Sequence, residues 1–572
     1  MSLLTAEQSL QVALLHHGAG RMDQAEKLYR DVLSQQPDHA AALNSLGVLA
    51  IQTGRPDQAV RLLQRAVSIK PSAASYHCNL GEAHRHLGQI DEAIIEYRQA
   101  IRLQGDLAVA HGNLGIALGE RNEIDTAIAC YRKAISLQPT YADAYANLGS
   151  ALTRKGQLDE AIAACHKAIS LQPTGAPAYN NLGVVLAEKG DFESAIAAYR
   201  KAIELKSDYS DAHSNLGNAY AALGESDKAI RACQTAVKFA PHAVQAHWNL
   251  AVALLRAGQF KVGWEEYEWR WAAYKRRGSL RFSDPAWDGS PLNGRTILLH
   301  AEQGFGDAIQ FARCVPLVAQ LGGKVIFECP PELFELFKSL PGGAELIASG
   351  AQLPHYDLHC PLMSLPRALK TRLDSIPANV PYLAADSHRV EEWKSILGDS
   401  QNRLKIGLAW AGKPTHTNDR NRSADLSHFA PLTDCGAIFH SLQKVPLPAR
   451  PRAGLDLIDH ASQLTDFAET AALIANLDLV ITVDTSVAHL AGALAKPTWV
   501  LLPHLADWRW LTHRTDSPWY PTTRLFRQKA PGDWSAVIHE VVEALRLLAM
   551  IGPRPMFQGA RRARRPWDSN PV

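Results

Sequence analysis

The sequence predicts an α-solenoid of repeated helix pairs followed by an α/β region made of two doubly wound halves. A 34-residue period runs through the first half of the chain, and all thirteen tryptophans lie at or after Trp248. From residue 296 onward, strand and helix patterns alternate. The predicted parts are a solenoid in residues 1–275, a linker in 276–295, α/β halves in 296–390 and 391–550, and a tail in 551–572.

Three residue series define the repeat. A leucine recurs every 34 residues from Leu46 to Leu250, and an alanine recurs with the same period from Ala25 to Ala229. Prolines close most units, as at Pro139 and Pro173. This pattern resembles the tetratricopeptide repeat, which has two helices per unit. The segment from Val12 to about Trp271 has room for eight such pairs.

An asparagine precedes the leucine of most units. In the unit that contains Leu148, Asn147 is expected to point roughly 150° away from the face that enters the core. First helices line the concave groove of such a solenoid, so the amides would form a ladder along it. An amide offers one acceptor and two donors, which suits the backbone of an extended peptide. The ladder comprises Asn79, Asn113, Asn147, Asn181, Asn215 and Asn249.

The ladder is similar to one in the eukaryotic protein O-GlcNAc transferases, where it holds the acceptor polypeptide. The alternative is that asparagine is simply common at this repeat position. The final unit departs from the pattern, because Gly263 replaces the alanine and Trp264, Trp269 and Trp271 follow. We interpret these rings as a cap docked against the next domain, in preference to an aromatic ligand site.

Bulk composition excludes several classes of protein. The net charge of +2 indicates no general affinity for nucleic acid or membranes. None of the eight cysteines forms a C-x-x-C pair, so neither a zinc site nor a disulfide framework is indicated. The first residues carry no basic segment ahead of their apolar ones, and no apolar run approaches the ~18–20 residues of a membrane span. We therefore expect a reducing, cytoplasmic setting, and a disordered basic tail beyond Ile551.

The α/β region reads as strands followed by helices. Helices are expected at residues 304–322, 331–340, 466–476, 485–495 and 533–549. Strands are expected at residues 295–301, 324–329, 344–349, 404–410, 437–444, 455–460, 477–484 and 497–503. Residues 377–402 read as an interdomain segment. Two such halves place a cleft between the carboxyl ends of their strands, where open α/β sheets bind ligands.

One strand-to-helix junction carries chemistry-bearing side chains. The strand ends in Asp484 and Thr485, and Thr485 or Ser486 can cap the helix that follows. The free N–H groups of that helix form an anion site that suits a diphosphate. His489, one turn in, could donate to the same phosphate, and Asp484 could orient sugar hydroxyls. The alternative is an ordinary capped helix with a satisfied histidine.

This junction resembles the D-T-x-x-x-H segment of the heptosyltransferase-like (family nine) glycosyltransferases. Residues 299–318 resemble their N-terminal G-D segment, and residues 406–432 their first strand and loop after the domain switch. The resemblance, over roughly Thr296 to Ala549, implies the GT-B fold of two Rossmann-like halves and an inverting, metal-independent transfer. The sequence contains no D-x-D motif, which agrees with that implication.

The resemblance also assigns roles to further residues. Lys413, Arg420 and Arg422 lie in the loop that sends a cation to the diphosphate, although a solvated charged loop is the alternative. Asp307 matches the base in the G-D turn, and it could equally be a helix cap. Gly304 and Gly306 would let the backbone approach the donor or the acceptor sugar. Less supported substitutes for the base are His300, His359 and His416.

The two halves together predict a glycosyltransferase that uses a nucleotide sugar as co-substrate and no other cofactor. Its acceptor would be a protein Ser or Thr recruited by the repeat groove, an arrangement similar to the protein O-GlcNAc transferases. One alternative acceptor is a lipid-linked or polysaccharide glycan, with the solenoid docking a partner of the biosynthetic complex. A third hypothesis is a non-catalytic repeat scaffold with a vestigial GT-B half. No integral membrane segment and no nucleic-acid partner are expected.

Overall fold

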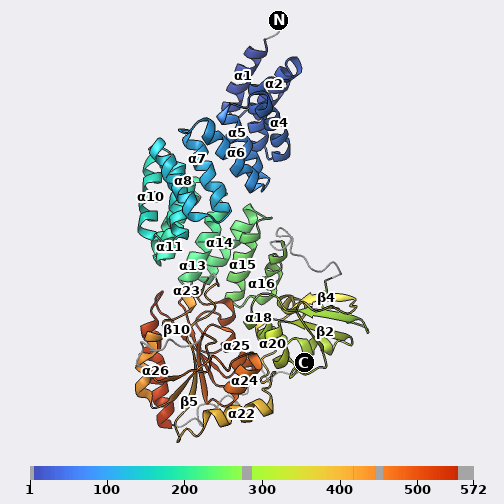
Figure 1. Cartoon of the computed structure of the whole chain (residues 1–572), viewed down its shortest axis with the longest axis vertical. Coiled ribbons are helices and arrows are strands. Elements are labelled where there is room, and N and C mark those ends of the chain that lie inside the picture. The colour runs from blue at the N-terminus through green and yellow to red at the C-terminus, as the bar shows by residue number, and fades with distance from the viewer. Residues whose placement is uncertain (1–4, 273–285, 417, 446–454, 552–572) are drawn as a thin grey trace. The chain divides into compact units, whose positions relative to one another are not determined.

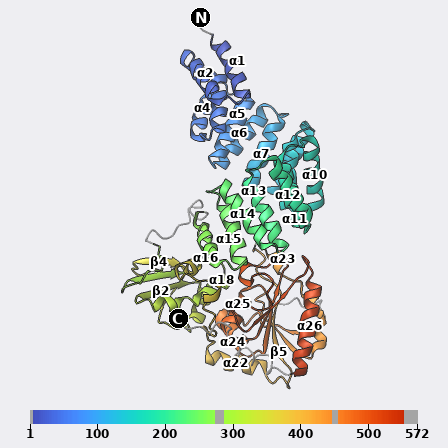
Figure 2. The same ribbon diagram turned by 180° about the vertical axis from the view of Figure 1, so that it is seen from behind.

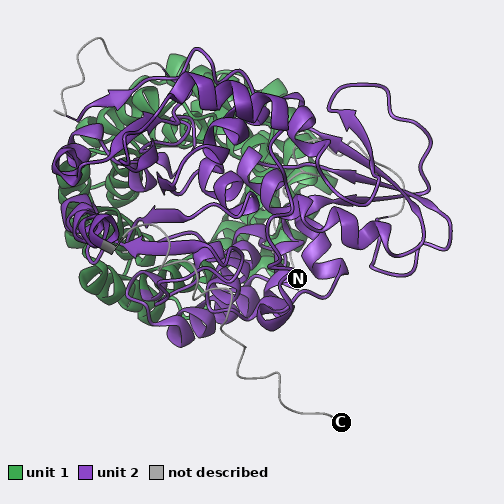
Figure 3. Cartoon of the chain, turned by 90° about the horizontal axis from the view of Figure 1, so that it is seen from below, with its two compact units in different colours: residues 1–219 green, residues 220–572 purple. Residues whose placement is uncertain are grey.

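A computed structural model describes residues 5–272, 286–416, 418–445 and 455–551 of the chain. The chain forms two compact units, Met1–Ala219 and Tyr220–Val572 (Figure 3). The expected linker at 276–295 is described from residue 286 on, and the expected tail lies outside the described residues after 551. Because the compact units divide after Ala219, the last repeats belong to the same unit as the α/β region.

The first unit is a stack of helix pairs (Figure 1). Its helices are α1 (Ala6–Gly18), α2 (Met22–Gln35), α3 (Ala40–Gln52), α4 (Pro56–Ile69), α5 (Ala74–His86), α6 (Ile90–Leu103), α7 (Ala108–Glu120), α8 (Ile124–Leu137), α9 (Ala142–Arg154), α10 (Leu158–Leu171), α11 (Ala176–Lys189) and α12 (Phe192–Leu205). The next helix, α13 (Ser210–Ala222), reaches across the division between the units.

The glycine of the repeat allows the two helices of a pair to approach closely. A Cβ atom at Gly115 would lie 2.6 Å from the Tyr131 ring, and one at Gly149 would lie 2.6 Å from the Cys165 sulfur. Tyr131 and Cys165 are both buried, as expected for side chains that fill the core between paired helices. The 34-residue period therefore encodes helix packing, and the prediction of eight pairs is confirmed by helices α1 to α16 within Ala6–Tyr267.

The last repeat helices pack into the α/β region. They are α14 (Ser226–Phe239), α15 (Val244–Arg256) and α16 (Phe260–Tyr267). Trp264 of α16 is buried and lies edge-on to Phe311 and Trp508, with ring centroids 6.2 and 5.1 Å apart. Trp269 instead stacks on His247 at 3.8 Å. Trp264 thus caps the last repeat against the α/β region as expected, whereas Trp269 packs on its own repeat.

The α/β region contains two sheets in which every strand pairing is parallel. The first sheet has the order β3-β2-β1-β4 and the second β10-β9-β8-β5-β6-β7. The strands are β1 (Thr296–His300), β2 (Lys324–Cys329), β3 (Glu345–Ala348), β4 (Leu358–Pro361), β5 (Lys405–Ala409), β6 (Ile438–Ser441), β7 (Leu457–Ile458), β8 (Leu479–Val483), β9 (Thr498–Leu502) and β10 (Thr523–Arg527).

Helices connect and cover these strands. The α-helices are α18 (Phe305–Ala312), α19 (Val315–Ala319), α20 (Pro331–Phe337), α21 (Leu365–Ala368), α22 (Ser387–Leu397), α23 (Asp419–Arg422), α24 (Phe467–Ala475), α25 (Ser486–Ala493) and α26 (Trp534–Ile551). Short 3-10 helices are η1 (Leu362–Ser364), η2 (Leu373–Ser375), η3 (Leu426–Cys435) and η4 (Trp508–Trp510). The helix expected over 304–322 is two helices, because a proline at position 316 cannot donate a backbone hydrogen bond.

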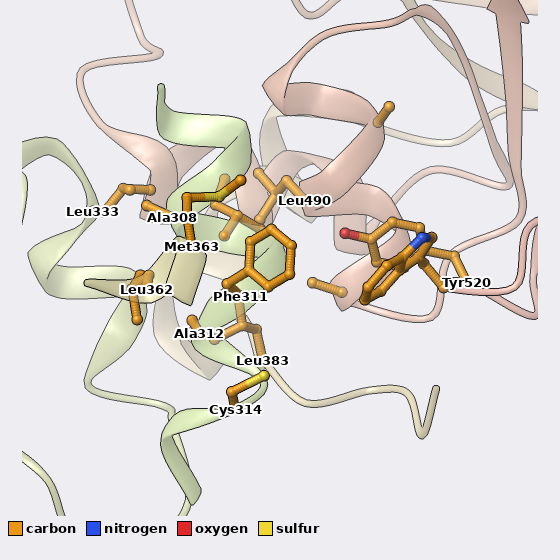
Figure 4. Close-up of a cluster of buried hydrophobic side chains, with 14 of the residues drawn as sticks. Ala308, Phe311, Ala312, Cys314, Leu333, Leu362, Met363, Leu383, Leu490 and Tyr520 are labelled. Atoms are coloured by element: carbon orange, nitrogen blue, oxygen red, sulfur yellow. The ribbon is translucent and has the colours of Figure 1, made fainter. Parts of the chain in front are cut away.

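One hydrophobic core cluster spans the two halves of the α/β region, and a second lies within the second half. Helix α26 covers one face of the second sheet, and α24 and α25 cover the other (Figures 1 and 2). On the latter face, Phe311 of α18 points toward Leu490 of α25 (Figure 4). The helix that follows β1 and the helix that follows β8 therefore lie against each other. This packing brings together the G-D turn of the first half and the strand-to-helix junction after β8 in the second half.

The segment 377–402, expected to separate the halves, carries helix α22. Arg389 of this helix donates to Glu469 at 2.9 Å, and the Trp393 indole donates to the same carboxylate at 2.8 Å. These bonds fasten the segment to α24 of the second half. In the described part of the chain, no helix has both the length and the apolar character that crossing a membrane requires.

Candidate functional site

The candidate site lies at the carboxyl edge of the second sheet. Asp484 and Thr485 follow β8, and Thr485 is the N-cap of α25, its hydroxyl accepting from the Val487 N–H at 3.3 Å. Ser486 is the first residue of the helix rather than its cap. Asp484, Thr485 and Ser486 are all half-buried, so solvent reaches this helix N-terminus. The predicted capped helix is present, and its free N–H groups face the edge where α/β sheets bind ligands.

His489 is buried within this arrangement. Its Nδ1 atom lies 3.0 Å from the Tyr520 hydroxyl, and its ring stacks on Trp510 with centroids 5.5 Å apart. Burial, with the positive charge of Arg509, lowers the pKa of His489 to about 3. The imidazole is therefore neutral at physiological pH, so any hydrogen bond that it gives to a ligand comes without a charge.

The two glycines of the G-D turn have different surroundings. A Cβ atom at Gly306 would lie 2.8 Å from Cδ2 of His489, so glycine at this position allows α18 to approach α25. Gly304 is the N-cap of α18, and its N–H donates to the Asp307 carboxylate at 2.9 Å. Helix packing thus explains why position 306 is a glycine, a role that the sequence analysis missed.

Asp307 faces the second half of the α/β region. One of its oxygens accepts from the Gly304 N–H, and the other contacts the Arg509 guanidinium in an ion pair. Asp307 is therefore part of the helix cap, and it also points at residues from the neighbouring half. Its use as a base stays a prediction, because both of its oxygens already accept hydrogen bonds.

Arg509 is a site residue that the sequence analysis missed. It is buried in η4, where it donates to Asp507 at 2.8 Å and to Gln310 at 2.7 Å. Although burial opposes its charge, Asp507 and Asp307 raise the pKa of Arg509 above its ordinary value. The position of this segment in the sequence could have indicated it, since Asp507 lies after β9 as Asp484 lies after β8. Parallel strands bring such residues to one edge of a sheet.

Asp484 and Asp507 are close enough to influence each other. Burial, with the charge of Asp507, raises the pKa of Asp484 to about 6. Burial acts to raise the pKa of Asp507, but the charge of Arg509, its hydrogen bonds to Asp507 and the charge of Arg256 together outweigh burial and lower it. Two half-buried carboxylates close to each other thus divide into one that is readily protonated and one that stays ionised.

The loop after β5 brings one of its three predicted cations to the site. Lys413 and Arg420 are exposed, whereas Arg422 is half-buried, with its Nε 3.4 Å from Asp419. The charge of Arg422 contributes to lowering the pKa of both Asp484 and His489, which places its guanidinium within electrostatic reach of both.

The three histidines considered as substitutes lie in different places. His416 is an exposed residue of the loop after β5; partial desolvation and the charge of Arg422 lower its pKa, while Asp419 and Asp307 oppose that shift. His300 and His359 lie on neighbouring strands, 3.4 Å apart between ring nitrogens. No group of three His, Cys, Asp or Glu side chains within the described residues could hold a metal ion.

The asparagines of the ladder lie where successive first helices meet. Four of them donate to the residue 35 positions earlier, in the preceding repeat: Asn79 to Asn44 (2.9 Å), Asn113 to Cys78 (3.7 Å), Asn181 to the Ala146 carbonyl (3.0 Å) and Asn215 to Asn180 (3.0 Å). In the second unit, Asn249 is buried and accepts from Gln245 at 2.9 Å. The ladder of the first unit thus joins one repeat to the next. Each of these four amides uses one of its two N–H donors for this contact.

A pocket of about 400 Å³ lies in the first unit, between the second helices and the first helices of neighbouring repeats. Small side chains of α9 and α11, among them Ala146 and Ala178, contribute to its lining. Asp143 and Lys206 contribute opposite charges to its lining. The carbonyl of Ala146 accepts from Asn181, so the pocket adjoins the asparagine ladder.

Comparisons with known proteins match both halves of the chain. Residues 16–77 match a tetratricopeptide repeat family, and residues 74–267 match the C-terminal domain of cilia and flagella-associated protein 70. The first half carries tetratricopeptide repeats. Residues 463–501, which contain β8, α25 and most of β9, match glycosyltransferase family 9 (heptosyltransferase).

A curated relative and several solved structures are similar over part of the chain. Protein FlbA of Caulobacter vibrioides is 26% identical over 328 residues, which are 52% of this chain and 54% of that protein. The chain therefore spans about half the length of this relative. MamA is 30% identical over 28% of this chain and 95% of its own, with a TM-score of 0.26. YrrB, described as a TPR protein with an unusual peptide-binding site, is 22% identical over 32% of this chain and 95% of its own, also with a TM-score of 0.26.

Proposed function

We propose that the protein is a GT-B glycosyltransferase that binds a nucleotide sugar at the carboxyl edge of its second sheet. The observation that carries the proposal is the meeting of the capped N-terminus of α25 with Arg422 and Arg509, opposite Asp307 of the other half. A helix N-terminus and guanidinium groups together suit a diphosphate. The family 9 match over residues 463–501 includes this helix and supports the same activity.

The proposed transfer inverts the anomeric carbon of the donor sugar. The acceptor hydroxyl oxygen forms a bond to that carbon while the bond to the diphosphate breaks, and Asp307 takes the hydroxyl proton. The leaving diphosphate gains negative charge, which Arg422 and the helix dipole stabilise. Because Asp307 is paired with Arg509 in the free protein, the diphosphate would have to draw Arg509 away to free the base.

The same cations make a bound metal unnecessary in this proposal. Guanidinium groups and helix N–H groups neutralise the diphosphate, a task that a divalent ion performs in metal-dependent transferases. We therefore expect transfer to continue at an undiminished rate in the presence of a chelator.

A protein Ser or Thr is the acceptor that the repeats favour. Tetratricopeptide solenoids present extended binding surfaces, and the asparagine amides keep an acceptor oxygen and a second donor for a peptide backbone. The neighbouring pocket of about 400 Å³ could take a small side chain of that peptide. A glycan acceptor is the second candidate, and the heptosyltransferase description of the matched family favours it.

Calorimetric titration with a panel of nucleotide sugars, without added metal, tests the proposal. Binding of one donor, competed by its free nucleoside diphosphate, is the expected result. Transfer to peptide and glycan libraries then separates the two acceptors. If no donor binds, the glycosyltransferase proposal fails, and a non-catalytic scaffold becomes the better interpretation.

A further inference from the structure

The last repeat places an arginine beside the candidate site. Arg256 is the final residue of α15, and α15 packs against η4, which carries Arg509. Two contacts nearby join the repeats to the loop after β9. His504 Nε2 lies 2.9 Å from the Ala222 carbonyl, and a Cβ atom at Gly224 would lie 3.1 Å from His513.

Arg256 is a half-buried cation whose Nε atom has unused hydrogen-bonding capacity. Its Nε atom is inaccessible to solvent, yet no acceptor for it occurs among the residues that the structure describes. Burial lowers the pKa of Arg256, and the negative charge of Asp507 opposes that shift without cancelling it. A buried donor without a partner costs free energy in the free protein, which suggests that a ligand provides the partner.

A second arginine lies close to the first. Arg527 ends β10 at the same edge of the sheet, and its guanidinium donates to the Leu511 carbonyl at 2.9 Å. Burial and the charge of Arg256 lower the pKa of Arg527 to about 10. Of the nearby acidic groups, Asp507 is already paired with Arg509, and Asp484 has its pKa raised to about 6. The two half-buried arginines therefore have less negative charge around them than two neighbouring, partly desolvated cations require.

We propose that Arg256 and Arg527 bind the diphosphate of the nucleotide-sugar donor, so that the last repeat supplies a donor-binding side chain. This inference rests on the proposed function. It makes the end of the solenoid part of the donor site, in addition to any role of the repeats in holding an acceptor. A phosphate anion supplies the acceptor that Arg256 Nε lacks and relieves the repulsion between the two guanidinium groups.

The test compares Arg256→Met with the full-length wild-type protein, using inorganic pyrophosphate, UDP, GDP and ADP as probes in calorimetry. Loss of a charge-assisted hydrogen bond to the diphosphate should weaken binding about tenfold to a hundredfold. Arg256→Lys should recover part of it, because lysine keeps the charge and loses the fork of donors. Arg154→Met is the matched control, since Arg154 ends α9 at the same repeat position and donates to the Gly119 carbonyl at 2.9 Å.

Thermal unfolding separates binding from a structural role. Without ligand, Arg256→Met should unfold at a higher temperature than the wild type, because an unpaired, half-buried cation is removed. With the probe present, it should gain less stability than the wild type. Equal binding by both proteins overturns this inference and leaves the proposed function standing. A wild type that binds no probe contradicts both, and a large loss of stability in ligand-free Arg256→Met shows a structural role instead.

Discussion

The two compact units differ in how deeply they bury charged side chains. In the first unit, ion pairs lie on the surface and join successive repeats, as in Arg121–Asp91 and Lys189–Asp159, both at 2.8 Å. The second unit has exposed pairs too, such as Lys324–Glu345, but it also buries several charged side chains, among them Arg509 at 7% exposure. Exposed pairs contribute little each, whereas buried charges are costly unless they are paired.

The difference shows in which part of the chain the free-energy cost of burying charged side chains is concentrated. A repeated structure gains its stability in small, similar increments, so no single polar pair of the first unit is critical. The buried charges near α18, α25 and η4 converge on one place and leave the Arg256 Nε unsatisfied. Such concentration is typical of binding and catalytic sites. Four predictions test this contrast.

The largest effect is expected from Asp307→Asn in the second unit. If Asp307 is the base, the transfer rate should fall by a factor of about 10²–10⁴ while donor binding is kept. Steady-state kinetics and calorimetry on the same preparation measure the two effects. The asparagine can still accept from the Gly304 N–H, so the helix cap should survive.

Asp386→Asn is the control for this substitution. Asp386 also takes part in a helix cap: it is the N-cap residue of α22 and accepts from the Arg389 N–H at 3.0 Å. Its replacement should leave the transfer rate within about twofold of the wild type, since capping effects are near 1 kcal/mol and act on stability. Equal, small losses in both variants would leave Asp307 with a capping role alone.

The sequence predicted the repeats well because their signal is periodic. Leucine, glycine and alanine recur every 34 residues at the positions where helices touch, so the spacing alone identifies the residues that pack. The parallel strands were also found wherever they are apolar throughout, as β8 is. The edge strand β10 was missed because Arg524 and Arg527 interrupt its pattern, and β4 because it is short and ends in Pro361.

The candidate site was predicted in part. Asp307, Asp484 and His489 were found because they follow strands in recognisable segments. Arg509 was not, since its importance depends on Asp307, which is 202 positions earlier in the chain. Contacts between the two halves arise from packing of α18 on α25, and a local pattern does not encode them. The role of Gly306 was missed for the same reason, because its neighbour is His489.

The second prediction concerns the independence of the units. Trp264→Ala should destabilise the second unit by about 3–5 kcal/mol, because the ring is fully buried against Phe311 and Trp508. Tyr131→Ala removes a buried ring from the first unit and should lower that unit's transition instead. Calorimetric unfolding should show two transitions, each moved by one variant. A single transition moved equally by both would contradict the division into units.

The third prediction uses the titration of Asp484. Its folded-state pKa, about 6, lies above the ordinary value of 3.8, so the folded protein binds the proton more tightly than the unfolded chain. The stability of the second unit relative to Asp484→Asn should fall as pH rises from about 4 to about 6. A shift of this size corresponds to at most about 3 kcal/mol. Donor binding should weaken over the same range, since ionised Asp484 repels a diphosphate.

Urea unfolding at several pH values measures this difference. Asp478→Asn is the control, because Asp478 is exposed at the opposite end of β8. If the stability difference between wild type and Asp484→Asn is constant from pH 4 to pH 7, the environment of Asp484 is not the one described.

The smallest effect is expected in the asparagine ladder of the first unit. Asn181→Ala removes a hydrogen bond to the Ala146 carbonyl and should cost about 1 kcal/mol. Asn147→Ala should cost less, because none of the hydrogen bonds found among the described repeats involves the Asn147 side chain. If the ladder also holds a peptide, Asn147→Ala should raise the KM for a protein acceptor without changing donor hydrolysis. Equal loss of both activities would show that the ladder serves the stacking of repeats and not the recognition of an acceptor.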